Sequence, residues 1–279
     1  MRAAVLERPE SIAETHLGNR LGYSDPPIAV DVNVTDAQLD AMLGHVIKTW
    51  SRLGVEEPYW SVISSDEFRT REKPSRAEFY ALGESDRDEL LATLRRNQIE
   101  LSSLRTCLEL GCGVGRTTWQ LAQVFDRVYG FDVSEPHLSL AKDWCALNKV
   151  VNVEFSQGSS TNALETLPSV DVVYSTIVLQ HNPPPVMASM LSSALRCLNP
   201  GGVAVVQLPT YDRNYSFDVE QYLAFAQTNT AIEMHVLPQA EVFRVVEAEG
   251  CRTMEVFEDS WTGLAPKTTS NTFVIQRPR

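Results

Sequence analysis

The feature that most constrains the fold is a glycine-rich segment near the middle of the chain. A short apolar run, Thr106–Leu110, is followed by three glycines at alternate positions, Gly111, Gly113 and Gly115, and then by a helical pattern from Arg116. The run predicts a buried strand, and the glycines permit positive φ angles and leave no Cβ between the backbone and a ligand. The segment therefore predicts a strand, a turn and a helix, with the turn forming a close-contact surface.

After this segment, apolar runs of strand length alternate with segments of helical periodicity. Strands are predicted at residues 106–110, 127–132, 152–156, 170–175, 202–208, 252–258 and 271–276, and helices at 116–125, 135–147, 186–198 and 239–249. Such alternation is typical of a mostly parallel sheet covered by helices on both faces. We therefore predict an α/β fold with a doubly wound sheet over residues 106–279.

The residues before this core have a mostly helical pattern. A capping box that starts at Thr35 predicts a helix through about Arg52, and Ser85 is predicted to open a second helix. The first part of the chain, with several prolines and glycines, lacks sustained periodicity. We therefore predict a mobile tail over residues 1–30 and a helical lead-in over residues 31–105.

Composition narrows the classes of partner and compartment. The chain has 24 Lys and Arg against 36 Asp and Glu, a net charge of −12 without a basic run, which argues against nucleic acids and anionic membranes as partners. Its five cysteines are an odd number without a C-x-x-C pair, which favours reduced thiols over disulfides or a zinc site. No apolar run approaches the ~18 residues of a membrane span, and no secretory leader is evident. We therefore expect a cytoplasmic protein that does not insert into membranes.

A carboxylate after the next predicted strand sharpens the interpretation of the glycine turn. Asp132 ends that strand, and in a doubly wound sheet an acid at this position can accept two hydrogen bonds from a ribose diol. The spacing G-x-G-x-G differs from the G-x-G-x-x-G of dinucleotide-binding enzymes, which disfavours a nicotinamide-dependent oxidoreductase. The turn and the acid together predict a nucleoside site.

These residues resemble the class I S-adenosylmethionine-dependent methyltransferases. Residues 109–115 are similar to the first motif of that family, Asp132 is similar to its ribose-binding acid, and residues 195–203 are similar to the turn before its fifth strand. The resemblance implies a Rossmann-like, seven-stranded sheet whose last strand is antiparallel. It also implies S-adenosylmethionine as cofactor, S-adenosylhomocysteine as product, and a small-molecule or glycan acceptor, as in bacterial members that modify such molecules.

The resemblance further implies which residues bind the cofactor. Gly111, Gly113 and Gly115 would pass beneath its methionine part, and Glu109 would orient their loop. Asp132 would hold the ribose.

The adenine end of the site is less regular than the family pattern. Val133 is placed to cover an adenine face, although an apolar residue after a strand more often packs in the core. The acid that often follows the third strand is missing, so the adenine amino group is assigned to Ser159, with Asn162 or a backbone carbonyl as alternatives. Gly158 and Ser175, at the ends of the third and fourth predicted strands, complete the candidate cofactor set.

Catalysis of methyl transfer consists largely of aligning the acceptor and excluding water, and only an acceptor such as an alcohol also needs a base. His181 follows the fourth predicted strand and is the candidate catalytic residue, because imidazole suits proton transfer near neutrality. Its alternative role is to fix a loop.

The acceptor pocket has four candidate residues. Sugar and polyol pockets combine aromatic faces with hydrogen-bonding groups, which could be supplied here by Tyr59, Trp60, Tyr211 and His235. Each of the four could instead be core or surface.

The leading functional hypothesis is O-methylation of a small-molecule or glycan hydroxyl. We predict no metal, because residues 172–185 contain no carboxylate. The alternatives are an N-methyltransferase acting on a small amine and a non-catalytic, S-adenosylmethionine-binding regulatory or interaction protein. The lead-in is expected to form a lid and part of the acceptor site. His45 and His137 have no partner visible in the sequence and are assigned no role.

Overall fold

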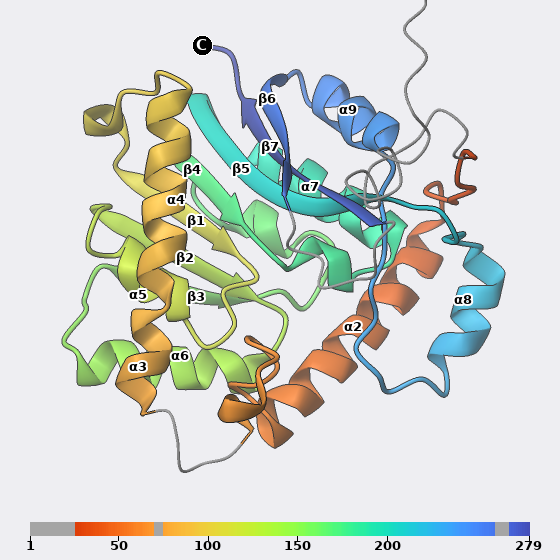
Figure 1. Ribbon diagram of the computed structural model, residues 1–279, viewed down its shortest axis with the longest axis horizontal. Coiled ribbons are helices and arrows are strands. Elements are labelled where there is room, and N and C mark those ends of the chain that lie inside the picture. Colours follow the sequence, from red (N-terminus) through yellow and green to blue (C-terminus); the bar gives the residue numbers. More distant parts are fainter. Residues whose placement is uncertain (1–25, 70–74, 260–267) are drawn as a thin grey trace, which may run out of the picture.

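The computed structural model describes residues 26–69, 75–259 and 268–279, so most of the predicted tail over residues 1–30 lies outside the described residues. A seven-stranded sheet forms the centre of the molecule (Figure 1). The strands are β1 Thr106–Leu110, β2 Arg127–Asp132, β3 Val153–Gln157, β4 Val170–Ser175, β5 Leu198–Asp212, β6 Arg252–Asp259 and β7 Thr268–Gln276. Each corresponds to one predicted strand.

The strand order is β3-β2-β1-β4-β5-β7-β6. Strands β1 to β5 pair in parallel, and β7 runs antiparallel to β5 and β6, which confirms the predicted Rossmann-like sheet. The chain builds the sheet in one direction from β1 to β3 and in the other from β4 onward. Because ligands bind at the carboxyl ends of the strands where this reversal occurs, the topology places a site between β1 and β4.

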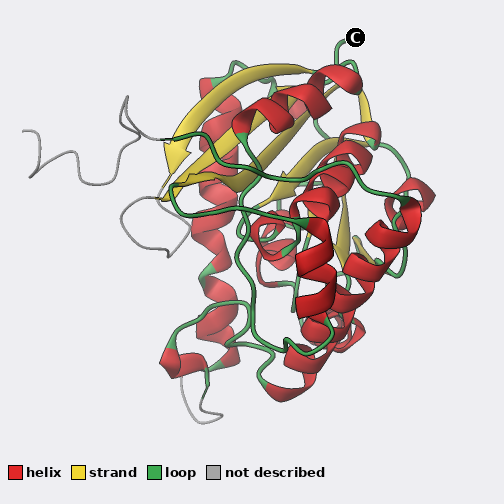
Figure 2. Ribbon diagram, turned by 90° about the vertical axis from the view of Figure 1, so that its right-hand side faces the viewer, coloured by secondary structure: helices red, strands yellow, loops and turns green. Residues whose placement is uncertain are grey.

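Helices cover both faces of the sheet (Figure 2). They are α2 Asp36–Glu56, α3 Arg76–Ala81, α4 Gly83–Arg96, α5 Arg116–Leu121, α6 Glu135–Leu147, α7 Pro184–Arg196, α8 Val219–Ala226 and α9 Gln239–Ala248, with short 3-10 turns at Asp66–Phe68, Leu101–Ser103, Ala163–Thr166 and Leu179–His181. Alternate residues of β5 point to opposite faces of the sheet. Ala204 and Val206 join the core cluster that contains α7 and α9, whereas Val203 and Val205 join the one that contains α4 and α5. Both faces are therefore buried, as expected for parallel strands.

The lead-in begins as predicted and then departs from the prediction. The Thr35 side chain caps α2 in a capping box with Gln38. The second helix, however, begins at Gly83 and not at Ser85, because it continues directly from α3. Sequence analysis missed α3, which is too short to show a helical period.

Packing explains why so short a helix as α3 is stable. Tyr80 at its end stacks on Trp144 of α6, with ring centroids 3.8 Å apart and an interplanar angle of 2°. Its hydroxyl donates a hydrogen bond of 2.8 Å to the carbonyl oxygen of Val114, inside the glycine turn. The lead-in is thus fastened both to the core and to the turn that forms the predicted site.

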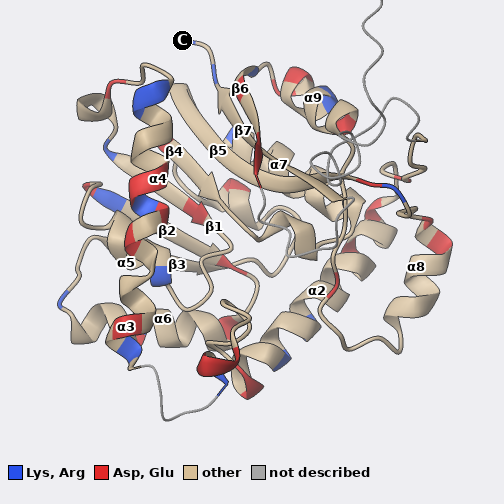
Figure 3. Ribbon diagram, in the orientation of Figure 1, with Lys and Arg blue, Asp and Glu red and all other residues tan. Residues whose placement is uncertain are grey.

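Charged side chains are spread over many elements, with acidic and basic residues interspersed (Figure 3). Within the described part of the chain, no helix is long and apolar enough to cross a membrane. The predictions of no nucleic-acid partner and of a cytoplasmic location stay predictions.

The contact between α4 and α5 gives a test of this packing. A Cβ added to Gly83 would lie 2.5 Å from the carbonyl oxygen of Arg116, a backbone atom that cannot rotate away. We expect Gly83→Ala to lower the free energy of unfolding by about 1–3 kcal/mol. The matched control is Gly44→Ala in α2, where nothing lies within 4 Å of an added Cβ. That change should raise the free energy of unfolding by about 0.5–1 kcal/mol, because alanine favours a helix interior. Urea denaturation measures both, and equal effects of one sign would contradict the packing described.

Candidate functional site

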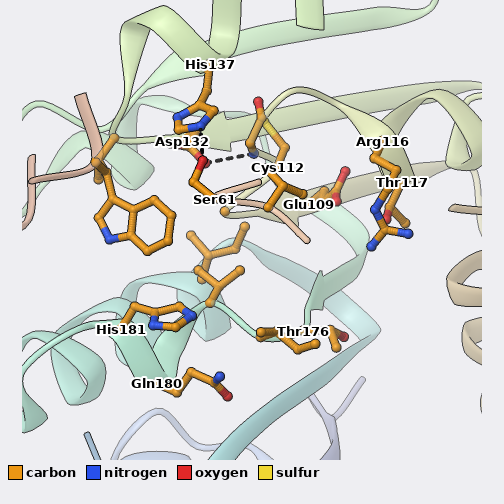
Figure 4. A pocket seen from close by; sticks show the side chains of 18 of the residues that line it. Ser61, Glu109, Cys112, Arg116, Thr117, Asp132, His137, Thr176, Gln180 and His181 are labelled. Atoms are coloured by element: carbon orange, nitrogen blue, oxygen red, sulfur yellow. Dashed lines mark hydrogen bonds between the residues drawn. The ribbon is translucent and has the colours of Figure 1, made fainter. Parts of the chain in front are cut away.

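A cavity of about 680 Å³ lies at the carboxyl ends of β1, β2 and β4, where the strand order reverses (Figure 4). Such a volume is within the range of small-molecule pockets. Seven of the residues predicted from the sequence line it, namely Trp60, Glu109, Gly111, Gly113, Asp132, Val133 and His181. Seven others do not, namely Tyr59, Gly115, Gly158, Ser159, Ser175, Tyr211 and His235.

The glycine turn needs its glycines for backbone and packing reasons. Gly111 has a φ of +77°, and an added Cβ would lie 2.2 Å from a methyl carbon of Val178, which packs directly on the turn. Gly115 also has a positive φ and caps α5, with its Cα against Ala141 rather than the cavity. The turn therefore brings bare backbone to the cavity at its start and fits tightly against α6 at its end.

Asp132 faces this turn (Figure 4). Its Oδ2 accepts a hydrogen bond of 2.8 Å from the amide of Gly113, and its Oδ1 accepts one of 2.8 Å from the amide of Ser134. Two backbone donors thus fix the carboxylate across the end of β2. A carboxylate has about four acceptor positions, so others remain for a ligand.

Glu109 and an ion pair form the opposite end of the cavity. Burial raises the pKa of Glu109 to about 8, while a hydrogen bond from the Thr118 hydroxyl and the Arg116 guanidinium act in the other direction. Arg116 itself pairs with Asp86 of α4, whose carboxylate also accepts from the hydroxyl of Thr117 at 3.0 Å. The sequence analysis missed Asp86 and Arg116 as cavity residues.

His181 has a defined tautomer. Its Nδ1 lies 2.9 Å from the carbonyl oxygen of Glu233. Since a carbonyl only accepts, Nδ1 carries the proton and Nε2 keeps a lone pair. Burial lowers the pKa of His181 to about 4, partly offset by the bond to Glu233. The imidazole is therefore neutral near pH 7, and its ring lies 5.2 Å from that of Trp50.

The wall beside His181 includes residues 232–234, which lie between α8 and α9 and belong to neither a helix nor a strand. Ile232 and Met234 line the cavity, while the carboxylate of Glu233 between them turns the other way. That carboxylate bonds to Nε2 of His45 at 3.0 Å and to Nε2 of His235 at 2.9 Å. His235 therefore lies behind the cavity wall, and His45, which the sequence left without a role, holds that wall to α2.

A second hydrogen-bonded histidine joins the lead-in to the end of the cavity that contains Asp132. Nε2 of His137 lies 2.9 Å from Oγ of Ser61, and its Nδ1 lies 2.7 Å from Oγ of Ser134. Ser134 is the same residue whose amide binds Asp132. The sequence offered no signal for this network, because its members come from segments far apart in the chain.

Three other predicted cofactor residues do not themselves line the cavity. A Cβ on Gly158 would lie 2.6 Å from the ring of Phe131, Ser159 is exposed, and the Ser175 hydroxyl donates to the carbonyl oxygen of Leu110 at 3.1 Å. Ser175 thus joins the ends of β4 and β1.

Two predicted acceptor residues also lie elsewhere. Tyr59 packs edge-on against Phe79, with ring centroids 5.1 Å apart. Tyr211 donates a hydrogen bond of 2.8 Å to the carbonyl oxygen of Pro26. In their place, Trp50 and Val46 of α2, spaced one helical turn apart, supply the apolar wall.

Part of the chain is similar in sequence to known proteins. Residues 107–202 match a family model described as a methyltransferase domain. A trans-aconitate 2-methyltransferase of Deinococcus radiodurans is 38% identical over 104 residues, which cover 37% of this chain and 37% of that protein. A ubiquinone biosynthesis O-methyltransferase of Pseudomonas fluorescens is 33% identical over 133 residues, which cover 47% of this chain and 53% of that protein. The matches thus span about half or less of each relative.

Among solved structures, a magnesium protoporphyrin IX methyltransferase from Synechocystis PCC 6803 with bound S-adenosylhomocysteine has a similar fold. Its TM-score is 0.57 at 18% identity, covering 84% of this chain and 99% of that chain, a likeness of fold alone. The strand order and the glycine turn with its acid agree with the predicted class I S-adenosylmethionine-dependent methyltransferase fold, and the match over residues 107–202 supports that prediction.

The Glu233 contacts predict a pH-dependent stability. Burial by itself raises the pKa of Glu233. Hydrogen bonds from His235 and Asn229 lower it by more than burial raises it, so the pKa falls from an ordinary 4.5 to about 2. A carboxyl with a depressed folded-state pKa stabilises the fold above its unfolded pKa, and that contribution is lost as the pH falls toward the folded value. We expect Glu233→Gln to lower the free energy of unfolding at pH 7, with the difference from wild type shrinking below about pH 4.5. Glu154→Gln, at an exposed position of β3, is the control and should show no such narrowing. A Glu233→Gln difference that is constant with pH would contradict the assignment.

Proposed function

We propose that the chain transfers a methyl group from S-adenosylmethionine to a hydroxyl of a small molecule. The observation that carries the proposal is the Asp132 carboxylate, held by two amides across from a bare glycine turn at the reversal of the sheet. This arrangement suits a ribose diol beside an extended nucleoside substituent. The names of the relatives, all methyltransferases, and the S-adenosylhomocysteine bound in the structural relative support it.

The residues that would hold the cofactor follow from the cavity. Asp132 would accept from the ribose hydroxyls, the backbone at Gly111 and Gly113 would pass along the methionine part, and Val133 would cover the adenine. When bound, the cofactor supplies an electrophilic methyl group on a sulfonium sulfur. Trp50 and Trp60 from the lead-in wall off the cavity, so the lead-in would act as the lid that excludes water.

The acceptor would be held by His181. Its Nε2 is an acceptor within the cavity wall, and a hydroxyl that donates to it is oriented with a lone pair available for attack. Because its pKa is about 4, this imidazole is neutral near pH 7, so Nε2 is free to accept the hydrogen bond and would take up the hydroxyl proton as the acceptor is methylated. The neighbouring wall of Trp50, Ile232 and Met234 suits an acceptor with an apolar body better than a glycan.

The ribose contact is tested by Asp132→Asn. We expect its affinity for S-adenosylhomocysteine in calorimetry to fall about 10–100-fold, because a charge-assisted pair of hydrogen bonds is weakened. Asp126→Asn, at an exposed position before β2, is the matched control and should bind like wild type. Tight binding by Asp132→Asn would overturn the cofactor assignment. Tight binding without turnover on any hydroxyl compound would favour a non-catalytic binding protein.

The role of His181 is tested by pH and by substitution. Because its folded-state pKa is about 4 and not 6.5, kcat/KM should stay level as the pH falls through 6.5 and decline only near 4. We expect His181→Ala to lower kcat about 10²-fold through misalignment of the acceptor, with the affinity for S-adenosylhomocysteine unchanged. Full turnover by His181→Ala, or an acid limb near 6.5 in the wild type, would contradict this role.

A further inference from the structure

We propose that Gln207 is a positioning residue, which keeps Ile177 in a left-handed backbone conformation and thereby shapes the acceptor wall that carries His181. The functional part of this inference rests on the proposed methyl transfer. The conformational part does not, and it is tested separately below.

Ile177 is the unusual residue of the loop after β4. Its φ is +57°, a region that a β-branched residue avoids because its Cβ crowds the backbone. The two other described non-glycine residues with positive φ, Gln98 and Lys149, directly follow the C-caps of α4 and α6, where this conformation commonly ends a helix. Ile177 follows a strand and lines the cavity, so a helix end does not account for it. Such a conformation persists only where the surroundings impose it.

The side chain of Gln207 imposes it. Its Oε1 accepts a hydrogen bond of 2.7 Å from the amide of Ile177. Its Nε2 donates to Oγ of Ser270 at 2.6 Å and to Oε1 of Gln180 at 3.3 Å. Gln207 is 1% exposed, lies within β5 and does not line the cavity. One buried amide thus holds both ends of the segment 177–180 and is itself anchored to β7.

The direction of the chain at Ile177 decides what the loop presents. Val178 packs on Gly111, and its carbonyl oxygen accepts from the amide of His181 at 3.1 Å, which starts the turn that aims the imidazole at Glu233. Ile177 itself is 44% exposed and part of the cavity wall, so it lies at the opening. With residue 177 in an extended conformation, the chain would leave β4 in another direction. Val178 would lose Gly111, and His181 would lose its bond to Glu233.

Two substitutions at position 177 separate backbone strain from side-chain loss. Alanine and glycine both remove the side chain, but only glycine adopts the left-handed region without a penalty. We expect Ile177→Gly to have a higher urea midpoint than Ile177→Ala, the reverse of the usual order. The opposite order would overturn the inference, and this comparison does not depend on whether any Gln207 variant folds.

The decisive experiment adds Gln207→Leu to three backgrounds: Ile177, Ile177→Ala and Ile177→Gly. The readout is the imidazole ¹⁵N spectrum of His181, which reports whether Nδ1 alone carries the proton. We expect Gln207→Leu to abolish the single-tautomer pattern with isoleucine or alanine at 177 and to leave it intact with glycine. Equal loss in the alanine and glycine backgrounds, or no loss in any, would overturn the positioning role.

Cofactor binding by the same variants keeps this test distinct from that of the proposed function. In the Ile177→Gly background the loop is expected to keep its conformation and Val178 its contact with Gly111. Adding Gln207→Leu to that background should therefore change the affinity for S-adenosylhomocysteine in calorimetry by no more than about twofold, a shift of less than 0.5 kcal/mol. If the wild type does not bind S-adenosylhomocysteine, the proposed function is wrong. The ¹⁵N spectrum of His181 would still decide whether Gln207 has the positioning role. A tenfold or greater loss of affinity on adding Gln207→Leu to the Ile177→Gly background would instead assign Gln207 to the cofactor site and contradict the proposal.

Discussion

The hydrogen bond from the Gly113 amide to the Asp132 carboxylate is the contact on which the site depends. It joins the turn after β1 to the end of β2, and it fixes the position of both at the reversal of the sheet. The turn can approach so closely because Gly111 has a positive φ and leaves room for Val178. A side chain at Gly111 would clash with Val178, and one at Gly113 would press on Val62, so either would disturb the surface along which a nucleoside could lie.

The cavity is completed by segments that a doubly wound sheet does not itself provide. α2 contributes Trp50, and the segment after α8 contributes Ile232 and Met234. Polar contacts hold these pieces in place: His45 and His235 bind Glu233 behind the wall, and His137 joins Ser61 of the lead-in to Ser134. The lead-in is therefore attached at two points by histidines whose partners are distant in the sequence.

Much of the fold could be predicted from local patterns. The bounds of β1, β2 and β4 agree with the prediction, because buried parallel strands are continuous apolar runs. β5 is longer than predicted, since its far end pairs with the start of β7, as Asp212 does with Thr268. α3 was missed because its stability comes from the stacking of Tyr80 on Trp144.

The site, like the fold, has some features that follow from local sequence patterns and others that depend on tertiary contacts. The sequence by itself determined the glycine turn, Asp132 and the placement of His181 after β4, because each depends on a neighbouring strand and on residue types with few alternatives. Only the tertiary structure decided that His235 and Tyr211 face away from the cavity, that the carbonyl of Glu233 fixes the tautomer of His181, and that Gln207 holds Ile177. These outcomes depend on hydrogen-bond partners brought together from distant segments and on burial, and neither is encoded in a local pattern.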